Sequence, residues 1–466
     1  MVEAATTAFI VAHLLLTEIV LVMALVMALS GIDDLFVDLV FLGRTIWHRL
    51  IIEPRWPRLG VATLRAVPPA PMAIIIPAWD EAAVIGAMLA RFFAELDYPI
   101  VQVFVGVYPN DPAGIAAVTA IADSRLMVVV CTRPGPTTKA DCLNHLWRAV
   151  VADEAASGRR FKAVVLHDAE DVIHPDELWV QNGLMPGLAM VQLPVEPLPD
   201  PESRWIAGHY IDEFATNHIK DVMVRASLGA AVPSAGVACA IDRALLGRIA
   251  AMAGGDPFDP TCLTEDYELG LKIKALGGAT ALVRVRNAHG TGVVATREHF
   301  PASFDTARRQ KTRWLLGIAL AGWDRLGWPG GVADRYMLGR DRKAVAAALL
   351  TLVAYAIALF GIADIALRRL AFADLALPPL FGPLAALLAL SNLALVGWRL
   401  AMRAACTGHV HGWREGVRAV PRALISNVIN AAAAWSACKR YRAMLGGGGA
   451  LTWDKTAHRF PISPLA

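Results

Sequence analysis

The segment His167-Asp168-Ala169-Glu170-Asp171 places three carboxylates within four residues. It directly follows the apolar run 163–166, which reads as a short buried strand. Like charges at the end of a strand repel one another unless a cation lies among them, and carboxylate oxygens are typical ligands of divalent cations. Ligands of open α/β sheets also bind at the carboxyl ends of strands. The segment therefore predicts a metal site, and a solvated acidic turn is the alternative.

A second acidic segment, Thr264-Glu265-Asp266-Tyr267-Glu268, precedes an apolar run that begins at Leu269. Thr264 suits the N-cap of a helix, and carboxylates in a first turn complement the helix dipole. Alternatively, one of these carboxylates is a general base, provided that burial and neighbouring carboxylates raise its pKa. The spacing of the residues fits both readings.

The third segment, Arg308-Arg309-Gln310-Lys311-Thr312-Arg313-Trp314, stands in a helical context that starts near Ser303. Gln310, Arg313 and Trp314 lie at i, i+3 and i+4 and so share one helix face. The cations and the apolar residues that follow favour a helix at the membrane surface. A Trp that stacks on a sugar, with an Arg directed at phosphate, is the second reading. The two readings suit opposite faces of the helix.

Two more segments fall at junctions between strands and helices. Pro77-Ala78-Trp79-Asp80-Glu81 ends the first expected strand, where its acids either bind a base or ribose or favour the helix start. The Pro- and Gly-rich turn 133–138 delivers hydroxyls and Lys139 to a helix start, which predicts a phosphate cradle. The glycine spacing of a Walker motif is absent from this turn.

All these segments must be positioned by alternating strands and helices. The expected strands are 72–76, 101–107, 126–131 and 163–167, and the expected helices begin near Glu81, Ala113 and Lys139. Strands separated by single helices predict a mostly parallel sheet covered by helices on both faces, as in nucleotide-binding α/β domains. A Pro-rich linker at 68–71 marks the start of this domain, which continues to about Arg286.

The composition indicates a membrane protein. The chain of 466 residues is 56% hydrophobic and only 18% charged, and its mean hydropathy is +0.47. A net charge of +3 gives no support to nucleic-acid binding. The six cysteines lack the spacing of metal ligands and fit reduced core residues.

Three apolar segments, 7–30, 344–363 and 375–398, are long enough to cross a bilayer. Arginines and lysines flank them so that the N-terminus is expected outside and the α/β domain in the cytoplasm. Residues 33–67 mix apolar and charged side chains and predict an amphipathic segment on the membrane surface, with a second short span as the alternative. The shorter apolar segment 424–438 contains polar residues and is bracketed by cations, which predicts an interfacial or re-entrant segment.

Taken together, the motifs resemble glycosyltransferase family 2, the membrane-embedded inverting enzymes that include cellulose and hyaluronan synthases. Their order is P-x-x-x-E at the first strand, K-A-D-C-L-N, an acidic motif at a central strand, T-E-D, and Q-x-x-R-W before the C-terminal membrane helices. The resemblance extends to the tail at Trp453-Asp454-Lys455-Thr456. It implies a GT-A domain, Rossmann-like with a mostly parallel sheet, inserted between N- and C-terminal transmembrane helices.

The resemblance also implies a division of the chain. The expected parts are a transmembrane helix at 1–32, an interfacial amphipathic segment at 33–67, the GT-A domain at 68–300, interfacial helices with the Q-x-x-R-W motif at 301–342, two transmembrane helices at 343–400, and an interfacial or re-entrant segment with a cytoplasmic tail at 401–466.

Carried over residue by residue, the resemblance implies a nucleotide-sugar site that holds Mg2+ or Mn2+. Asp168 and either Glu170 or Asp171 would bind the metal on the donor's diphosphate. Asp266, beside Glu265, would be the base that deprotonates the acceptor hydroxyl. The residues implied for donor binding are Glu81, Lys139, Asp141, Asp168, Gln310 and Arg313, and Trp314 is implied for the acceptor sugar.

The implied function is a metal-dependent inverting transferase of the bacterial inner membrane that uses a nucleotide sugar, with uridine as the expected nucleoside, to build an exported or envelope polysaccharide. One alternative is a non-processive transferase that acts on a lipid-linked acceptor. Another is a catalytically inactive scaffold for an outer-membrane partner and phage adsorption.

The resemblance further implies several partners. They are the nucleotide-sugar donor, a growing glycan or lipid acceptor, membrane lipids and an outer-membrane export partner. Longer relatives carry a C-terminal region that binds cyclic dinucleotide, whereas this sequence stops at Ala466. Control by a separate regulatory protein is therefore expected.

Overall fold

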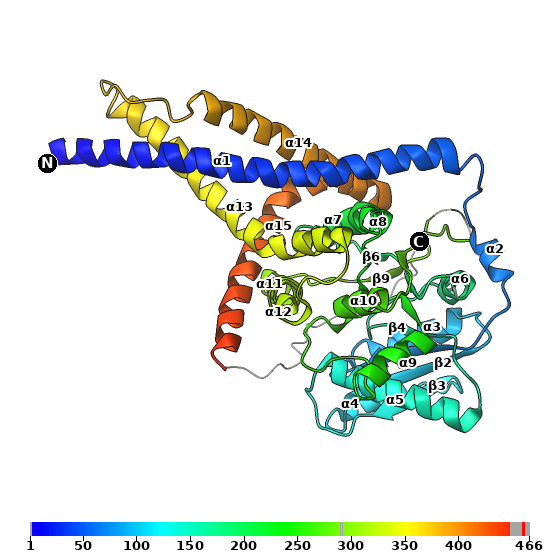
Figure 1. Cartoon of the computed structure of the whole chain (residues 1–466). Coiled ribbons are helices and arrows are strands. Elements are labelled where there is room, and N and C mark those ends of the chain that lie inside the picture. The colour runs from blue at the N-terminus through cyan, green and yellow to red at the C-terminus, as the bar shows by residue number, and fades with distance from the viewer. Residues whose placement is uncertain (1, 186, 289, 291, 448–458, 462–466) are drawn as a thin grey trace.

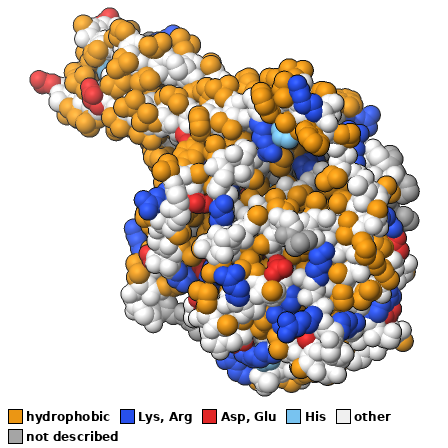
Figure 2. Space-filling view, turned by 45° about the vertical axis from the view of Figure 1, so that its right-hand side comes forward, with side chains coloured by type: hydrophobic (Ala, Val, Ile, Leu, Met, Phe, Trp, Pro, Cys, Tyr) orange, Lys and Arg blue, Asp and Glu red, His pale blue; other side chains and the backbone are white. Residues whose placement is uncertain are grey.

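The structure is a computed structural model that describes residues 2–185, 187–288, 290, 292–447 and 459–461. An α/β domain carries a projecting arm of long helices, and the N-terminus lies at the tip of this arm (Figure 1). Hydrophobic side chains gather over the arm, whereas Lys and Arg side chains lie mostly on the body of the molecule (Figure 2). The tail segment 453–456, which carries part of the resemblance, lies outside the described residues.

A seven-stranded sheet in the order β3-β2-β1-β4-β7-β5-β8 forms the centre of the domain. The strands are β1 (Met72–Pro77), β2 (Val101–Val107), β3 (Leu126–Val130), β4 (Ala163–Leu166), β5 (Met190–Gln192), β7 (Cys239–Asp242) and β8 (Thr280–Leu282). β7 runs antiparallel to both of its neighbours, and all other pairs are parallel. The predicted mostly parallel sheet is therefore confirmed. A second, parallel sheet joins β6 (Val195–Pro197) to β9 (Thr296–Glu298).

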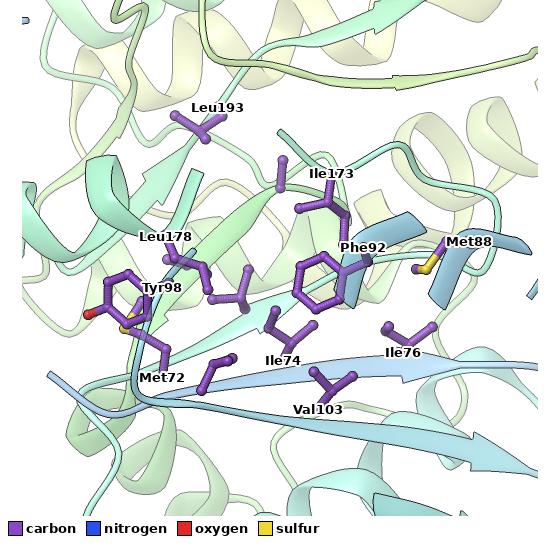
Figure 3. Packing of buried hydrophobic residues seen from close by; sticks show 14 of the residues in the cluster. Met72, Ile74, Ile76, Met88, Phe92, Tyr98, Val103, Ile173, Leu178 and Leu193 are labelled. Atoms are coloured by element: carbon purple, nitrogen blue, oxygen red, sulfur yellow. The ribbon is translucent and has the colours of Figure 1, made fainter. Parts of the chain in front are cut away.

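Helices cover both faces of the large sheet, so its central strands are apolar on both sides. Every residue of β1 is buried. Ile74 and Ile76 face Phe92 on one side (Figure 3), and Ile75 packs with Leu146 on the other. The first face is covered by α2 (Val61–Arg65), α3 (Ile85–Glu95), α4 (Pro112–Thr119) and α6 (Glu177–Leu184), and the second by α5 (Lys139–Ser157), α9 (Arg243–Met252) and α10 (Glu265–Ala275).

Three of the described helices are long and apolar enough to cross a membrane. They are α1 (Val2–Trp47) with the π-helical turn His48–Ile52, α13 (Val332–Leu370) and α14 (Pro383–His411). The three apolar segments expected to span the bilayer lie in these helices, the third of them beginning in the connection before α14. Together the helices form the apolar arm (Figures 1 and 2).

The first helix does not end where the sequence predicts. Residues 33–47 continue α1 without a break, whereas a separate amphipathic segment was expected from residue 33. The change in composition near residue 33 comes with no proline, so the backbone has no reason to stop being helical. This part of α1 packs on the domain, where Val37 is buried with Val224 and Met337.

Charged side chains mark the junction between the arm and the domain. Asp33 of α1 accepts hydrogen bonds from Tyr336 and Arg340 of α13. Asp38, also on α1, is buried and pairs with Lys220 of the domain at 2.5 Å. Because a buried carboxylate is costly without a cation, the Asp38–Lys220 pair helps to fix how α1 meets the domain.

The predicted re-entrant segment is part of a continuous helix. Residues 424–438 lie within α15 (Trp413–Leu445), which packs against α7, α11, α13 and α14. Arg422 of this helix is fully buried and bonds Asp212 of α7 at 2.6 and 3.0 Å. The remaining helices are α7 (Ile206–Thr216), α8 (Val222–Ser227), α11 (Phe304–Leu315) and α12 (Ala321–Leu326), with π-helical turns at Asn217–Asp221 and Leu316–Leu320.

Candidate active site

One pocket gathers chemical groups from segments that lie far apart in the sequence. It is formed where the carboxyl ends of β1 and β4 meet the starts of α5 and α10 and the last turns of α11. Most of the residues singled out from the sequence line it, namely Glu81, Lys139, Asp168, Glu170, Glu265, Asp266, Gln310, Arg313 and Trp314. Asp141 and Asp171 are not among the described lining residues.

The acidic loop after β4 presents two of its three carboxylates to the pocket. Asp168 and Glu170 line the pocket, and Asp168 remains partly exposed. Asp171 is fully buried beneath the loop, where its Oδ2 accepts a hydrogen bond from the Asp168 amide at 3.0 Å. The Asp171 carboxylate thus holds the loop from behind, whereas Glu170, the other residue predicted for the second metal ligand, lines the pocket.

A buried histidine completes the underside of this loop. The His167 side chain contacts Asp171 Oδ2 through Nδ1 and Glu177 Oε1 through Nε2, each at 2.7 Å. Burial alone would lower the pKa of His167, but the two carboxylates outweigh it and raise this pKa to about 10. The two carboxylates therefore favour the protonated form of the imidazole.

Lys139 provides a positive charge among the pocket carboxylates. Its Nζ lies 2.6 Å from Asp168 Oδ1. Burial would lower the pKa of the amine, but Asp168, Glu265 and Asp266 raise it overall. A cation at the start of α5 opposes the helix dipole. The surrounding carboxylates therefore keep Lys139 charged.

Asp141 lies in the first turn of α5 but outside the lining of the pocket. Thr138 caps this helix by accepting a hydrogen bond from the Asp141 amide at 3.2 Å. The Asp141 carboxylate accepts one from Arg133 at 2.7 Å. The Asp141 side chain thus pairs with the preceding turn, and its role in donor binding stays a prediction.

The segment after β2 holds the neighbouring turns in place. Asp111 caps α4 through the Gly114 amide and also accepts a hydrogen bond from the Asp80 amide, both at 2.9 Å. Asn110 bonds both the amide and the carbonyl of Gly135, at 2.7 and 2.8 Å. These two side chains therefore connect the segment after β2 to the turns that follow β1 and β3.

Glu265 and Asp266 stand side by side at the start of α10. Thr264 occupies the N-cap position, but its hydroxyl makes no capping hydrogen bond. Burial and the Asp266 charge raise the pKa of Glu265 to about 7. Burial also raises the pKa of Asp266, although Lys139 acts in the opposite direction. Proton exchange near neutral pH is therefore available at this pair.

Gly236 makes room for the Asp266 carboxylate. It has a φ of +80°, and a Cβ built on it would lie 2.5 Å from Asp266 Oδ2. Any other residue would be strained in this backbone conformation and would also displace the carboxylate. The loop before β7 is thus shaped around Asp266.

The two faces of α11 have different surroundings. Gln310, Arg313 and Trp314 line the pocket. The other side packs against the domain and α15, since Lys311 is buried and pairs with Glu213. Residues 310–312 are buried in protein, so the expectation of a membrane-surface face does not hold for this stretch.

Two features of the pocket were not predicted from the sequence, namely Glu298 and an aromatic wall. Glu298 of β9 is 8% exposed and lines the pocket. Burial and the nearby acidic loop raise the pKa of its carboxyl group. Phe214 and Phe300, with ring centroids 4.8 Å apart, also line the pocket beside Trp314. A lone Glu in a short β-strand carries no spacing signal that could have identified it.

The donor set fits a divalent cation that shares its coordination with a ligand. Asp168, Glu170 and Glu298 offer hard oxygen ligands in one pocket. Among the described residues, no three His, Cys, Asp or Glu side chains form a preassembled metal cluster. Phosphate and water oxygens would therefore complete the coordination, as is usual for Mg2+.

Comparisons with known proteins agree with this geometry. The family model described as "Glycosyltransferase like family 2" matches residues 68–317. Over 96% of its length the chain is 35% identical to Bacteriophage adsorption protein B of Escherichia coli K12 and, equally, to Bacteriophage N4 adsorption protein B of E. coli O157:H7. The chain spans 62% of the length of these curated relatives.

A solved structure shares the fold. It is a mannosyltransferase from Pyrobaculum calidifontis in complex with GDP-Man and Mn2+, with a TM-score of 0.50 and 17% sequence identity. The likeness covers 87% of this chain and 99% of that chain. The predicted GT-A fold between membrane helices is thereby confirmed.

Proposed function

Because the chain belongs to glycosyltransferase family 2, we propose that it transfers a hexosyl or N-acetylhexosaminyl group from a nucleotide sugar to an acceptor hydroxyl at the membrane. The expected donor is a UDP-sugar, and the expected product is an exported or envelope polysaccharide. The observation that carries the proposal is the convergence of Asp168, Asp266 and Arg313, from three distant segments, in one pocket.

The carboxylates after β4 suit the diphosphate end of the donor. Asp168 and Glu170 would hold Mg2+ or Mn2+ there, with Glu298 as a further oxygen donor in the same pocket. Such a cation neutralises negative charge that develops on a leaving diphosphate. Lys139 and Arg313 add positive charge on the protein side, and Gln310 can donate hydrogen bonds.

The acidic pair at the start of α10 suits the acceptor end. Asp266 would take the proton of the acceptor hydroxyl while its oxygen forms a bond to the anomeric carbon. The bond from that carbon to the diphosphate oxygen breaks on the opposite side, so the configuration inverts. Glu265 is buried beside Asp266, and the Asp266 charge helps to raise the pKa of Glu265. Trp314 supplies a flat apolar face for the acceptor sugar.

The helices of the arm support a membrane location. The cations around the spans favour an external N-terminus and a cytoplasmic active site. In the inner membrane of a bacterium, this orientation exposes the site directly to cytoplasmic nucleotide sugars. The names of the relatives support phage adsorption as an associated role.

A lipid-linked acceptor is the second candidate, and one observation favours it. An apolar groove lies between α7, α11 and α15, lined by Trp205, Ile206, Phe304, Leu424, Ile425 and Val428. Ile206, Ile425 and Trp314 pack against the same buried cluster. A hydrocarbon chain in this groove would therefore contact residues that pack against the same cluster as the acceptor wall of the pocket.

The direct test is a donor screen with the purified protein in lipid nanodiscs. Nucleotide sugars are supplied singly with Mg2+ or Mn2+, and release of nucleoside diphosphate and product size are measured. We expect turnover with one donor class only, dependent on the metal and lost in Asp266→Asn. Long products support polysaccharide synthesis, and single additions to a lipid support the second candidate. Donor binding without turnover for every donor would contradict both and favour a scaffold.

A further inference from the structure

The underside of the acidic loop is built from charged groups that have no access to solvent. His167, Asp171 and Glu177 each have a fully buried side chain. Glu177 comes from the first turn of α6, and its Oε1 also accepts a hydrogen bond from Gln181 at 3.0 Å. We call His167, Asp171 and Glu177 the histidine clamp. Burying three ionisable groups is costly, so their arrangement requires a reason beyond filling space.

The clamp is connected to the pocket through a backbone amide. Asp171 Oδ2 contacts His167 Nδ1 at 2.7 Å and accepts a hydrogen bond from the Asp168 amide at 3.0 Å. The Asp171 amide in turn bonds the Asp168 carbonyl at 3.3 Å. The turn from 168 to 171 is thus closed on both sides, and its outer residues Asp168 and Glu170 line the pocket.

A continuous chain of contacts connects helix α6 to the pocket. Glu177 orients the imidazole, the imidazole orients Asp171, and Asp171 fixes the amide of Asp168. A one-residue bridge between Val172 and Arg297 holds the far end of the loop against β9. The side chains of Asp168 and Glu170 are therefore carried by a turn that cannot swing freely.

We propose that His167 and Glu177 are positioning residues, which hold the turn at Asp168 and Glu170 in the geometry that binds the divalent cation. This inference rests on the proposed function, because it concerns the metal of the donor site. Neither side chain reaches the pocket, so they act only through Asp171 and the loop backbone. Outer residues of this kind typically change metal affinity by about 10- to 100-fold when altered.

The test measures metal binding rather than catalysis. Mn2+ is titrated into purified protein with UDP present, and free Mn2+ is followed by electron paramagnetic resonance. We expect Glu177→Gln and His167→Gln each to weaken Mn2+ binding about 10- to 100-fold. Binding of UDP without metal should change less than about twofold, because the clamp does not touch the rest of the pocket. The double variant should lose little more than either single variant, since both act through Asp171.

Asn182→Ala is the matched control. Asn182 is fully buried on the same helix α6, where it bonds Lys162 and the Pro68 carbonyl away from the pocket. We expect this variant to lower the thermal unfolding temperature while its Mn2+ affinity stays at the wild-type value. A fall in Mn2+ affinity equal to that of Glu177→Gln would show a general loss of stability and overturn the inference.

Two further outcomes separate the inference from the proposed function. Wild-type protein that binds no Mn2+ with any nucleoside diphosphate would overturn the metal-dependent function and the inference together. Wild-type protein that binds Mn2+, with Glu177→Gln and His167→Gln binding it equally well, would overturn the inference alone.

Discussion

The Nζ of Lys139 lies 2.6 Å from Oδ1 of Asp168, so a helix start and a strand end meet as an ion pair inside the pocket. Lys139 also interacts with the charges of Glu265 and Asp266. One ammonium group therefore balances carboxylates from two different motifs. The net charge of the pocket therefore depends on Lys139 as well as on the carboxylates around it.

Replacing Lys139 by Met should weaken donor binding. The loss of a charged contact to phosphate, worth about 1.5 to 3 kcal/mol, predicts a fall in UDP affinity of about 10- to 100-fold. Lys139→Arg should retain part of the affinity because it keeps the charge. Lys272→Met on the surface of α10 is the control, since Lys272 is more than one-third exposed. Calorimetric titration of UDP checks the result, and unchanged affinity in Lys139→Met would contradict it.

Asp266→Asn should remove sugar transfer and leave nucleotide binding intact. General base catalysis contributes about 10² to 10⁴ in rate, so turnover should fall by at least the lower figure. Asp256→Asn provides a matched control, because Asp256 forms an exposed pair with Arg148 away from the pocket. The measurement compares initial rates and UDP affinity of both variants. Wild-type turnover in Asp266→Asn would rule out Asp266 as the base.

Glu170 and Asp171 should respond differently to neutralisation. Glu170→Gln should weaken Mn2+ binding without lowering the unfolding temperature, because Glu170 faces the pocket. Asp171→Asn should destabilise the domain by about 3 to 5 kcal/mol, because it leaves the buried His167 with one carboxylate fewer. Metal titration and thermal unfolding of the two variants check this contrast. Equal stability of both variants would contradict the buried role of Asp171.

The rate should depend on pH near neutrality. The pKa of Glu265 is raised to about 7 and that of Asp266 is raised as well, so the base form of the pair is lost as the pH falls. We expect kcat/KM to rise from pH 6 to pH 8 and then level off. Glu265→Gln removes a neighbouring negative charge and should move the rising limb to lower pH. Profiles of kcat/KM against pH for the wild-type protein and Glu265→Gln check this prediction. An unchanged rising limb in Glu265→Gln would show that Glu265 does not influence the pKa of the base.

Arg422→Met should destabilise the contact between α15 and the domain. Arg422 is fully buried and bonds Asp212 and Glu415, so its removal leaves a buried carboxylate with one partner fewer, at a cost of about 3 to 5 kcal/mol. Arg418→Met is the matched control, because Arg418 pairs with the same Glu415 but is more than one-third exposed. Unfolding temperatures in detergent should fall only for Arg422→Met.

The sequence predicted the strands that precede the site with little error. Continuous apolar runs such as 72–76 are fully buried in a parallel sheet, so their limits are visible in composition alone. The pocket residues that follow these strands were predicted because their sequence motifs lie directly at the strand ends. Asp171 could not be assigned, because the direction of its side chain depends on a turn closed by the Asp168 amide.

Other features depended on contacts between distant residues. Glu298 reaches the pocket because β9 pairs with β6, about one hundred residues earlier in the chain, and no local pattern records that pairing. The continuity of α1 beyond residue 32 was missed because a shift in composition suggested a new element. The charged and apolar side chains of residues 33–47 instead contact the domain, as the pair of Asp38 with Lys220 shows.

The uninterrupted α1 helix has a consequence for how the domain is oriented at the membrane. Its 46 residues extend for about 69 Å, more than twice the thickness of a hydrocarbon core of about 30 Å. The part beyond the bilayer therefore acts as a rigid shaft that carries the α/β domain at a set angle. One inserted residue near position 31 would turn that shaft by about 100°, whereas seven would nearly restore its phase. The residue count of α1 thus sets the angle between its apolar face in the bilayer and the face that packs on the domain.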